Sequence, residues 1–460
     1  MVGMLLLNSC NQPQSSSALA PILEPLPQDP LIQVYFNHSQ ANAYTEPYRP
    51  IERLGNNLEQ VIVEAIAAAE LSIEIAVQEL NLPQIAQALQ ERHQAGVRVR
   101  VILENHYSRP WSDLTAGKIE KLRERDRTKY AEFLQLVDQN QDEQLSPTEI
   151  NAADALQILH QAQIPWIDDT ADGSKGSGLM HHKFVVVDGT TVITGSSNMT
   201  TSGIHGDFLN LGSRGNANHL VKIASPALAK LFIEEFNLMW GDGPGGQPDS
   251  RFGLQKPYRP AQEVILSGGS SIKVQFSPTT SARPWSESVN GLINDALAQA
   301  TQTIDLALFV FSDQNLSRQL ESRHQQQVEI RALIDAGFAY RNYSEGLDLM
   351  GLAIPDQRCR YEQNNHPWQH PIMTVGSPHL PEGDVLHHKF GLIDQKTVIL
   401  GSQNWSQAAN EKNDENLLVI HNPTVAAHFE REFERLYTTA TLGITARVQA
   451  KIQAQQEQCR

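Results

Sequence analysis

Two segments of the chain repeat the same reactive residue types about two hundred positions apart. Residues 179–200 read LMHHKFVVVDGTTVITGSSNMT, and residues 386–406 read LHHKFGLIDQKTVILGSQNWS. Each fits the pattern His-x-Lys, four residues, Asp, six residues, Gly-Ser-x-Asn. The matching positions are His181, Lys183, Asp188, Gly195, Ser196 and Asn198 in the first segment and His387, Lys389, Asp394, Gly401, Ser402 and Asn404 in the second.

Each motif combines an imidazole, an ammonium, an amide and a hydroxyl, a set that suits a phosphodiester. Residues two apart on a strand project to the same face, so we expect His181 and Lys183 to point together. The adjacent His182 and His388 should then point away. Lysines and asparagines can hold the phosphate oxygens in the transition state, while one neutral imidazole attacks phosphorus and the other, protonated, donates to the leaving alkoxide. Histidine takes both forms near neutral pH, and this chemistry requires no metal.

The twin motifs resemble the HKD signature of the phospholipase D superfamily, and both copies keep every position of it. The resemblance covers roughly residues 30–437. It implies one active site at the interface of the two copies and a phosphohistidine intermediate that water or another alcohol resolves. It implies that His181 is the nucleophile and His387 the general acid and base, that Asp188 and Asp394 are structural, and that catalysis uses no cofactor.

Members of this superfamily often continue with Asn-x-Glu, whose carboxylate orients a catalytic histidine. The second half has Asn413 and Glu415 within NDENLLVI, whereas the first half has NANHLVKI and places Asn218 where the glutamate would stand. An amide can hold an imidazole but does not stabilise an imidazolium as a carboxylate does. We considered Asp207 as a residue that could compensate for this difference.

The elements that must position these residues are also duplicated. Matching pairs are residues 70–77 with 302–309, 91–103 with 322–334, and 225–240 with 422–437. They have the patterns of a strand, of a helix end followed by a strand, and of a final helix. Helices interleaved with strands predict an α/β fold: two pseudo-twofold-related phospholipase D-like α/β sandwich domains with a small helical insertion.

The repeat also predicts the domain organisation. The first half is longer before its motif, which places an insertion there, and a Gly- and Pro-rich stretch separates the halves. The expected segments are a leader and tether (1–30), a first domain (31–240) with the insertion at about 115–165, a linker (241–262), a second domain (263–440) and a C-terminal tail (441–460).

The insertion contains a sequence that resembles a calcium-binding EF-hand loop, DQNQDEQLSPTE at residues 138–149. Helical patterns flank it on both sides. The sixth position is normally glycine, which takes a sharp turn, but here it is Glu143. The alternative is an acidic turn between two helices that binds no metal. The predicted Ca²⁺ ligands are Asp138, Asn140, Asp142, Gln144 through its carbonyl, Ser146 and Glu149.

Composition and the ends of the chain bear on location. The chain has 460 residues and a formal net charge of −16. This negative charge argues against a protein whose main function is to bind nucleic acid. The first residues, MVGMLLLNSC, resemble a short bacterial lipoprotein signal that ends at Cys10. We therefore expect an exported protein, lipid-anchored, periplasmic or extracellular, with a cytoplasmic location left open. Cys359 and Cys459 could pair in an oxidising compartment or remain two thiols.

The motifs fix the reaction better than the substrate. We expect a phospholipase D that hydrolyses phospholipid to phosphatidate and head group at a membrane surface, and we expect a monomer. The alternatives are a metal-independent endonuclease acting on nucleic acid, and an inactive homologue that only binds phosphate. Aromatic segments at residues 105–111, 338–343 and 361–371 could surround the site and contact acyl chains or bases, or simply pack locally.

Overall fold

The computed structural model describes residues 22–459 except 175 and 177, and the predicted leader with Cys10 lies outside this part. The first half forms a seven-stranded sheet in the order β1-β9-β8-β7-β4-β5-β6. β4 and β5 are parallel, and β7 and β8 form an antiparallel hairpin. The strands are β1 (Ile32–Phe36), β4 (Ser72–Val77), β5 (Arg98–Leu103), β6 (Trp166–Asp168), β7 (Lys183–Val187), β8 (Thr191–Gly195) and β9 (His219–Ala224).

The second half forms a nine-stranded sheet in the order β10-β11-β19-β17-β16-β12-β14-β15-β20. β12 and β14 are parallel and β16 and β17 form a hairpin, so the core of this sheet repeats the first. The strands are β10 (Gln262–Ile265), β11 (Ser271–Phe276), β12 (Thr303–Leu308), β14 (Glu329–Ile334), β15 (Val375–Ser377), β16 (Lys389–Ile393), β17 (Thr397–Gly401), β19 (Asn416–His421) and β20 (Thr441–Leu442). Two small pairs complete the strands, β2 (Ala43–Thr45) with β3 (Glu52–Leu54) and β13 (Phe311–Ser312) with β18 (Trp405–Ser406).

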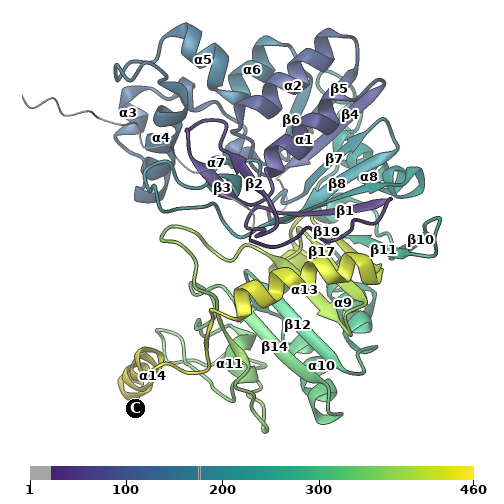
Figure 1. Ribbon diagram of the computed structural model, residues 1–460, viewed down its shortest axis with the longest axis vertical. Helices are drawn as coiled ribbons and strands as arrows, with labels where there is room; N and C mark the ends of the chain where they lie inside the picture. The colour runs from purple at the N-terminus through teal and green to yellow at the C-terminus, as the bar shows by residue number, and fades with distance from the viewer. Residues whose placement is uncertain (1–21, 175, 177, 460) are drawn as a thin grey trace, which may run out of the picture.

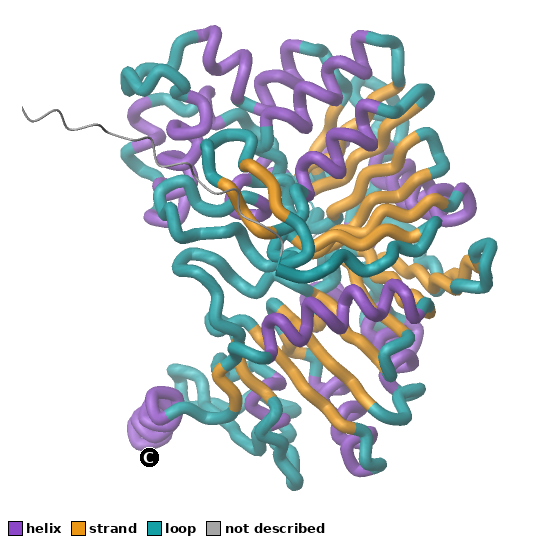
Figure 2. Tube along the Cα trace, in the orientation of Figure 1, coloured by secondary structure: helices purple, strands orange, loops and turns teal. Residues whose placement is uncertain are grey.

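Helices cover both faces of each sheet, and the predicted α/β sandwich fold is confirmed (Figures 1 and 2). The first half contains α1 (Leu58–Ala67), α2 (Pro83–Gln94), α3 (Ala116–Ile119), α4 (Glu124–Val137), α5 (Pro147–Ala153), α6 (Ala155–Gln161), α7 (Thr201–Ile204) and α8 (Pro226–Trp240). The second half contains α9 (Val289–Leu297), α10 (Gln314–Gln325), α11 (Glu345–Leu349), α12 (Gln407–Glu411), α13 (Pro423–Tyr437) and α14 (Ala446–Gln458). In the described residues, no helix is long and apolar enough to cross a membrane.

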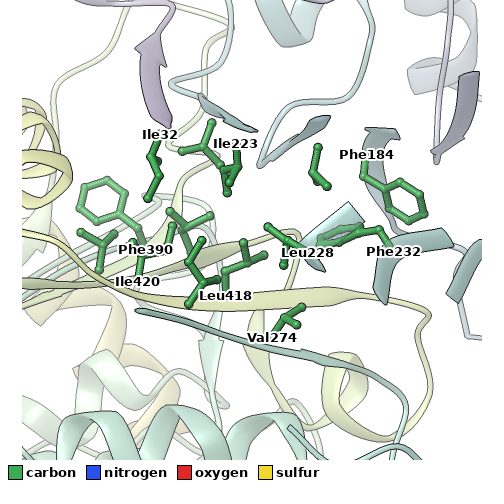
Figure 3. Close-up of a cluster of buried hydrophobic side chains, with 14 of the residues drawn as sticks. Ile32, Phe184, Ile223, Leu228, Phe232, Val274, Phe390, Leu418 and Ile420 are labelled. Carbon is green, nitrogen blue, oxygen red and sulfur yellow. The ribbon is translucent and has the colours of Figure 1, made fainter. Parts of the chain in front are cut away.

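The two halves share one hydrophobic core. Its buried side chains come from the first sheet, from the second sheet, and from α8 and α13, the helices that follow the motif hairpins. Figure 3 shows part of this cluster, with Phe184, Leu228 and Phe232 from the first half and Val274, Phe390 and Leu418 from the second. Separate apolar clusters lie under α1, α2 and α6, and under α9 and α10. The central core therefore fixes how the two motif hairpins face each other.

Residues 441–459 pack against the second half, where we expected a C-terminal tail. β20 pairs with β15 at the edge of the second sheet, and Val448 and Ile452 of α14 are buried in the core of the second half. A disulfide joins Cys359 to Cys459 and ties the end of α14 to a loop a hundred residues earlier. This Gln-rich helix has only two large apolar side chains, Val448 and Ile452, so its pattern does not predict a buried face.

The central core predicts a large energetic role for Phe429 of α13. Its ring is fully buried and makes edge-on contacts with Phe36 at 5.1 Å and Phe390 at 5.0 Å, one residue from each half. Phe429→Ala should lower the free energy of unfolding by about 3–5 kcal/mol, because it leaves a cavity between the halves. Urea denaturation measures this value. Leu254→Ala, at a side chain that is 59% exposed, should change it by less than about 0.5 kcal/mol.

Equal destabilisation by the two substitutions would contradict the assignment of this cluster as the shared core.

Candidate active site

Two short backbone bridges connect the halves next to the motif histidines. Met180 pairs with Asp414 and Ala217 pairs with Leu386, each as an isolated parallel bridge. The backbone N–H of His181 donates to the Asp414 carbonyl at 3.0 Å. In the same way, the backbone N–H of the second motif histidine donates to the Ala217 carbonyl at 3.1 Å. Each motif histidine is thus anchored to the other half of the chain.

The side chain of His181 is oriented by a carboxylate from the second half. Its Nδ1 lies 2.7 Å from Oε2 of Glu415, which is fully buried, while Asn413 donates to the other carboxylate oxygen at 3.1 Å. An ionised carboxylate only accepts, so Nδ1 carries the proton and Nε2 holds the free electron pair. Glu415 was predicted from the sequence to orient a histidine, and the structure places it on the histidine of the opposite half.

The second motif histidine is oriented by an amide from the first half. Nδ1 of His387 lies 2.9 Å from Oδ1 of Asn218, the residue equivalent to Glu415. Ser196 donates to the same oxygen at 2.7 Å, and Nδ2 of Asn218 donates to the Gly203 carbonyl at 2.8 Å, which fixes the orientation of the amide. Asp207, which we considered as a compensating carboxylate, interacts with Glu132 and not with this histidine.

The two histidines and the two lysines of the motifs converge. Lys183 Nζ donates to the His181 carbonyl at 2.9 Å and Lys389 Nζ to the His387 carbonyl at 2.8 Å. The charges of both lysines act on both histidines. Both lysines are also within the electrostatic reach of Glu415. The two imidazoles therefore face one common site between the halves.

Burial and mutual repulsion shift these groups toward neutrality. Burial, followed by the charges of Lys183 and Lys389, holds the pKa values of His181 and His387 well below the usual range. Burial lowers the pKa of Lys183 to about 7, although Glu415 partly opposes this. Burial, together with the charge of Lys183, holds the pKa of Lys389 well below its usual range. Burial raises the pKa of Glu415 to about 7. An anion placed among these groups would raise the pKa values of the lysines and of the histidines, and so would favour charged lysines and a protonated His387.

The asparagines and the serines of the two motifs have different surroundings. The side-chain oxygens of Asn198 and Asn404 are buried without a hydrogen-bond partner in the described residues, at the two ends of the motif hairpins. Ser402 Oγ accepts the backbone N–H of Asn416 at 3.1 Å and contacts Glu415, so the two motif serines position the groups that orient the histidines.

Asp188 and Asp394 lie at the far end of the hairpins from the histidines. Asp188 accepts backbone N–H groups from Glu70, Leu71 and Ser72 at the start of β4, and Asp394 accepts the equivalent groups at the start of β12. Burial raises the pKa of each carboxyl, but these hydrogen bonds lower it below the usual value. Both residues also hold a left-handed turn, with φ of 52° and 50°. Both aspartates thus bind the turn of the hairpin to the neighbouring strand and lie away from the histidines.

The adjacent histidines point away from the site, as strand alternation predicts. Nε2 of His182 pairs with Glu235 of α8 at 2.9 Å, and Nε2 of His388 pairs with Glu432 of α13 at 2.9 Å. We did not identify these glutamates from the sequence, although their offset of 197 residues is that of the helices themselves. They fix each motif strand against the helix that follows it.

One aromatic ring of the site was also missed. The ring of Phe309, at the end of β12, lies 4.9 Å from that of His387 and 5.1 Å from Lys389 Nζ. Phe338, from one of the aromatic segments noted above, packs edge-on against Phe309 at 4.7 Å. By contrast, Trp368 is buried in the core of the second half and serves local packing.

The loop that resembles a calcium-binding loop lies between α4 and α5, as expected. Its acidic side chains accept hydrogen bonds from groups of the same loop. Asp138 accepts the backbone N–H groups of Asp142 and Glu143, and Glu149 caps α5 and accepts from Asn140. Glu143 adopts φ of 62°, the left-handed turn that glycine takes in such loops. Within the described residues, no group of three or more His, Cys, Asp or Glu side chains is arranged to hold a metal ion.

Comparison with known families assigns the chain to a class. Residues 62–240 and 293–437 match the family described as "Cardiolipin synthase, PLD-like domain", one segment in each half. The chain therefore belongs to the phospholipase D-like family, and the predicted resemblance is confirmed.

Individual relatives agree with this assignment. The chain is 30% identical to the mitochondrial cardiolipin hydrolase of Mus musculus over 34% of this chain and 60% of that protein. It is 27% identical to a phospholipase D of Rickettsia bellii over 29% of this chain and 56% of the relative. The chain thus spans a little more than half of the length of the relatives it matches. The phosphatidylserine synthase of Haemophilus influenzae has the same fold, with a TM-score of 0.54 and 13% identity over 91% of this chain and 88% of that one.

The shifted pKa values predict a narrow pH optimum near neutrality for turnover of a phosphodiester. As pH falls through about 7, Glu415 gains a proton and no longer stabilises a cationic His181; as pH rises through about 7, Lys183 loses its proton. Glu415→Gln should remove the acid limb, lower the plateau of kcat/KM about 100-fold, and move the alkaline limb to lower pH, because Lys183 loses a counter-charge. The pH profile of kcat/KM measures all three effects.

Glu411→Gln makes the same chemical change four residues earlier, at a side chain that bonds only Gln407 among the described residues, and should leave the profile unchanged. An acid limb that persists in Glu415→Gln would show that another group controls it.

Proposed function

We propose that this protein is a phosphodiesterase of the phospholipase D type that hydrolyses phospholipids. The observation that carries the proposal is the crossed pairing at the interface, which brings His181 with Glu415 and His387 with Asn218 to one site flanked by two lysines. A single phosphodiester can contact all of these groups at once. An inactive phosphate-binding protein would not need both imidazoles to keep a free ring nitrogen facing that site.

The reaction proceeds in two displacements. Nε2 of His181 attacks phosphorus as the bond to the leaving alkoxide breaks, and His387 in its protonated form donates its proton to that oxygen. Neutral His387 then removes a proton from water, which attacks phosphorus and breaks the P–N bond, releasing a phosphate monoester and regenerating both histidines. Lys183 and Lys389 neutralise the phosphate oxygens in both steps, and Asn198 and Asn404 provide amide groups beside them.

The roles of the two histidines follow from the different side chains that contact their Nδ1 atoms. Phosphorylation makes the His181 ring cationic, and the Glu415 carboxylate at Nδ1 stabilises that charge. The amide of Asn218 holds His387 without adding negative charge, so its protonated form gives up a proton more readily to the leaving group. His181 as nucleophile and His387 as general acid and base follow from this difference.

A lipid substrate is supported by three observations. The relatives with recognisable sequence similarity are named cardiolipin hydrolase and phospholipase D. The net charge of −16 disfavours a polyanionic nucleic acid as the main partner. Phe309 and Phe338 present an apolar edge beside His387. We take a metal-independent endonuclease as the alternative, and we expect a monomer.

We also propose that the protein is exported. The disulfide between Cys359 and Cys459 supports this location, since such bonds persist in oxidising compartments. Anchoring through Cys10 would place the enzyme at a membrane that contains its substrate. Detection of the lipid-modified amino terminus by mass spectrometry of the membrane fraction tests the anchor.

The nucleophile assignment is tested by comparing two variants on phosphatidylcholine vesicles. His181→Ala should abolish head-group release, a loss of about 10⁴-fold or more, since no covalent intermediate can form. His387→Ala should also be inactive on the lipid, but it should still form phosphohistidine from an ester with a good leaving group, which needs no proton. Acid-quenched mass spectrometry detects that adduct on the peptide that contains His181.

An adduct on the His387 peptide would reverse the roles. Plasmid nicking by the wild type without lipid turnover, in buffer with a chelator, would favour the endonuclease, and the absence of both activities would favour a binding protein.

Calcium binding at residues 138–149 stays a prediction. If the loop binds Ca²⁺, adding Ca²⁺ should raise the melting temperature of the wild type, and Glu149→Gln should remove that increment. Glu143→Gly should enlarge it, because glycine adopts the left-handed turn at about 1 kcal/mol lower cost. Differential scanning calorimetry with and without Ca²⁺ measures the increment; identical melting temperatures in both buffers would exclude the site.

A further inference from the structure

One carboxylate of the second half holds a loop of the first half beside the active site. Asp384 stands three residues before His387, in the loop that leads from β15 to β16. Its Oδ1 accepts from the Ser213 hydroxyl and from the backbone N–H of Gly215, the latter at 3.1 Å, and its Oδ2 accepts from the backbone N–H of Arg214 at 2.7 Å. Burial raises the pKa of Asp384 to about 6 against these three hydrogen bonds, so the group is mostly ionised at neutral pH.

The three donors belong to the loop that leads to the partner of His387. Residues 213–215 end three positions before Asn218, whose amide oxygen lies 2.9 Å from Nδ1 of His387. Between these points the two segments run parallel, and the backbone N–H of Ala217 donates to the Val385 carbonyl at 2.9 Å. The carboxylate is therefore at one end of a short parallel contact between the halves, and the imidazole of His387 is at the other.

The equivalent contact beside the first motif is made by the backbone alone. Gly178 stands three residues before the first motif histidine, at the position of Asp384 in the second half. Its backbone N–H donates to the Lys412 carbonyl at 2.7 Å, and a Cβ atom there would lie 2.6 Å from Oδ1 of Asn413. The backbone N–H of Asp384 instead donates to the Pro381 carbonyl within its own turn at 3.1 Å. The side chain of Asp384 therefore makes the contact that the backbone makes in the other half.

Each of the two segments is also fixed within its own half. The fully buried Arg53 donates to the Ser213 carbonyl at 2.8 Å in the first half. In the second half, the carboxylate of Asp335, which follows β14, accepts the backbone N–H of Leu386 at 3.0 Å. Loss of the Asp384 carboxylate should therefore shift the two segments relative to each other, while both halves stay folded.

We propose that Asp384 is a positioning residue for His387, which holds this imidazole against Asn218 and the bound phosphodiester. His181 is oriented by a separate contact, with Glu415, that Asp384 does not touch. A misplacement of about 1 Å in an active site can lower a rate about 100-fold. The loss should therefore fall on the steps in which His387 transfers a proton and should spare the attack of His181. This inference rests on the proposed function for the role of His387, whereas the position of the two segments can be measured without turnover.

The experiment separates the two histidines by the leaving group of the substrate. Asp384→Asn keeps the shape of the side chain but replaces one accepting oxygen with an NH2 group, so one of the three donors loses its acceptor. Choline release from phosphatidylcholine needs a proton on the leaving alkoxide, so its kcat should fall about 30-fold with KM within about twofold of the wild type. Phosphohistidine formation on His181 from an ester with a good leaving group needs no such proton. Its single-turnover rate, measured by acid quench and mass spectrometry, should stay within about twofold of the wild type.

Asp356→Asn is the matched control. It makes the same chemical change in another loop of the second half, at a carboxylate that accepts the backbone N–H groups of Arg358 and Arg360. Both rates should remain those of the wild type.

Hydrogen exchange of the backbone amides gives a measurement that needs no substrate. The amides of Ala217 and His387, which donate across this contact, should exchange faster in Asp384→Asn than in the wild type. The amide of His181, which donates to the Asp414 carbonyl in the other contact, should keep its rate.

Equal losses on the lipid and on the activated ester would overturn the proposal, because they would indicate general damage to the fold. Unchanged lipid hydrolysis in Asp384→Asn would overturn it as well, and so would unchanged exchange at Ala217 and His387. If the wild type hydrolyses no phosphodiester, the proposed function fails, whereas the exchange of these amides still shows whether Asp384 holds His387 in place.

Discussion

The structure depends on a reciprocal exchange of hydrogen bonds between its two halves. Each motif histidine donates its backbone N–H to a carbonyl of the opposite half, and each imidazole meets the side chain that follows that carbonyl. The residue after Asp414 is Glu415, and the residue after Ala217 is Asn218. A shift of either half along the interface would break the backbone bridge and the side-chain pair together, so the packing of α8 and α13 in the central core controls the geometry of the site.

The linker reinforces this arrangement. Lys256 forms ion pairs with Glu235 of α8 and with Asp414, which supplies the carbonyl to His181. Burial lowers the pKa of Lys256, but these two carboxylates raise it above its usual value overall. The same Glu235 accepts from His182. The buried Lys256 therefore connects the helix behind the first motif with the segment that orients the first motif histidine. The other half uses Arg435 and Glu432 for the corresponding contact with His388.

Much of this arrangement could be predicted because the chain contains two copies of the same structural unit. The offset of 197 residues that relates the final helices also relates Asn218 to Glu415, and strand alternation separates His181 from His182. The crossed pairing could not be predicted, because periodicity reports which face a side chain takes on its own strand and not which neighbour it meets across an interface. The packing of α14 was missed for a related reason: Val448 and Ile452 are too few to form an apolar stripe, and the disulfide that holds the helix joins residues remote in sequence.

Under the proposed mechanism, the difference between Glu415 and Asn218 lets a duplicated site perform an asymmetric reaction. Two identical halves would place identical imidazoles at the phosphate, and only the orientation of the substrate would decide which one is the nucleophile and which the acid. One carboxylate and one amide at the same position separate them: the carboxylate stabilises positive charge on His181, and the amide leaves His387 free to lose its proton. The lysines, the asparagines and the remote aspartates can stay symmetric, since both displacements need the same neutralisation of the phosphate and the same hairpins. Only the residue that touches each Nδ1 has to differ.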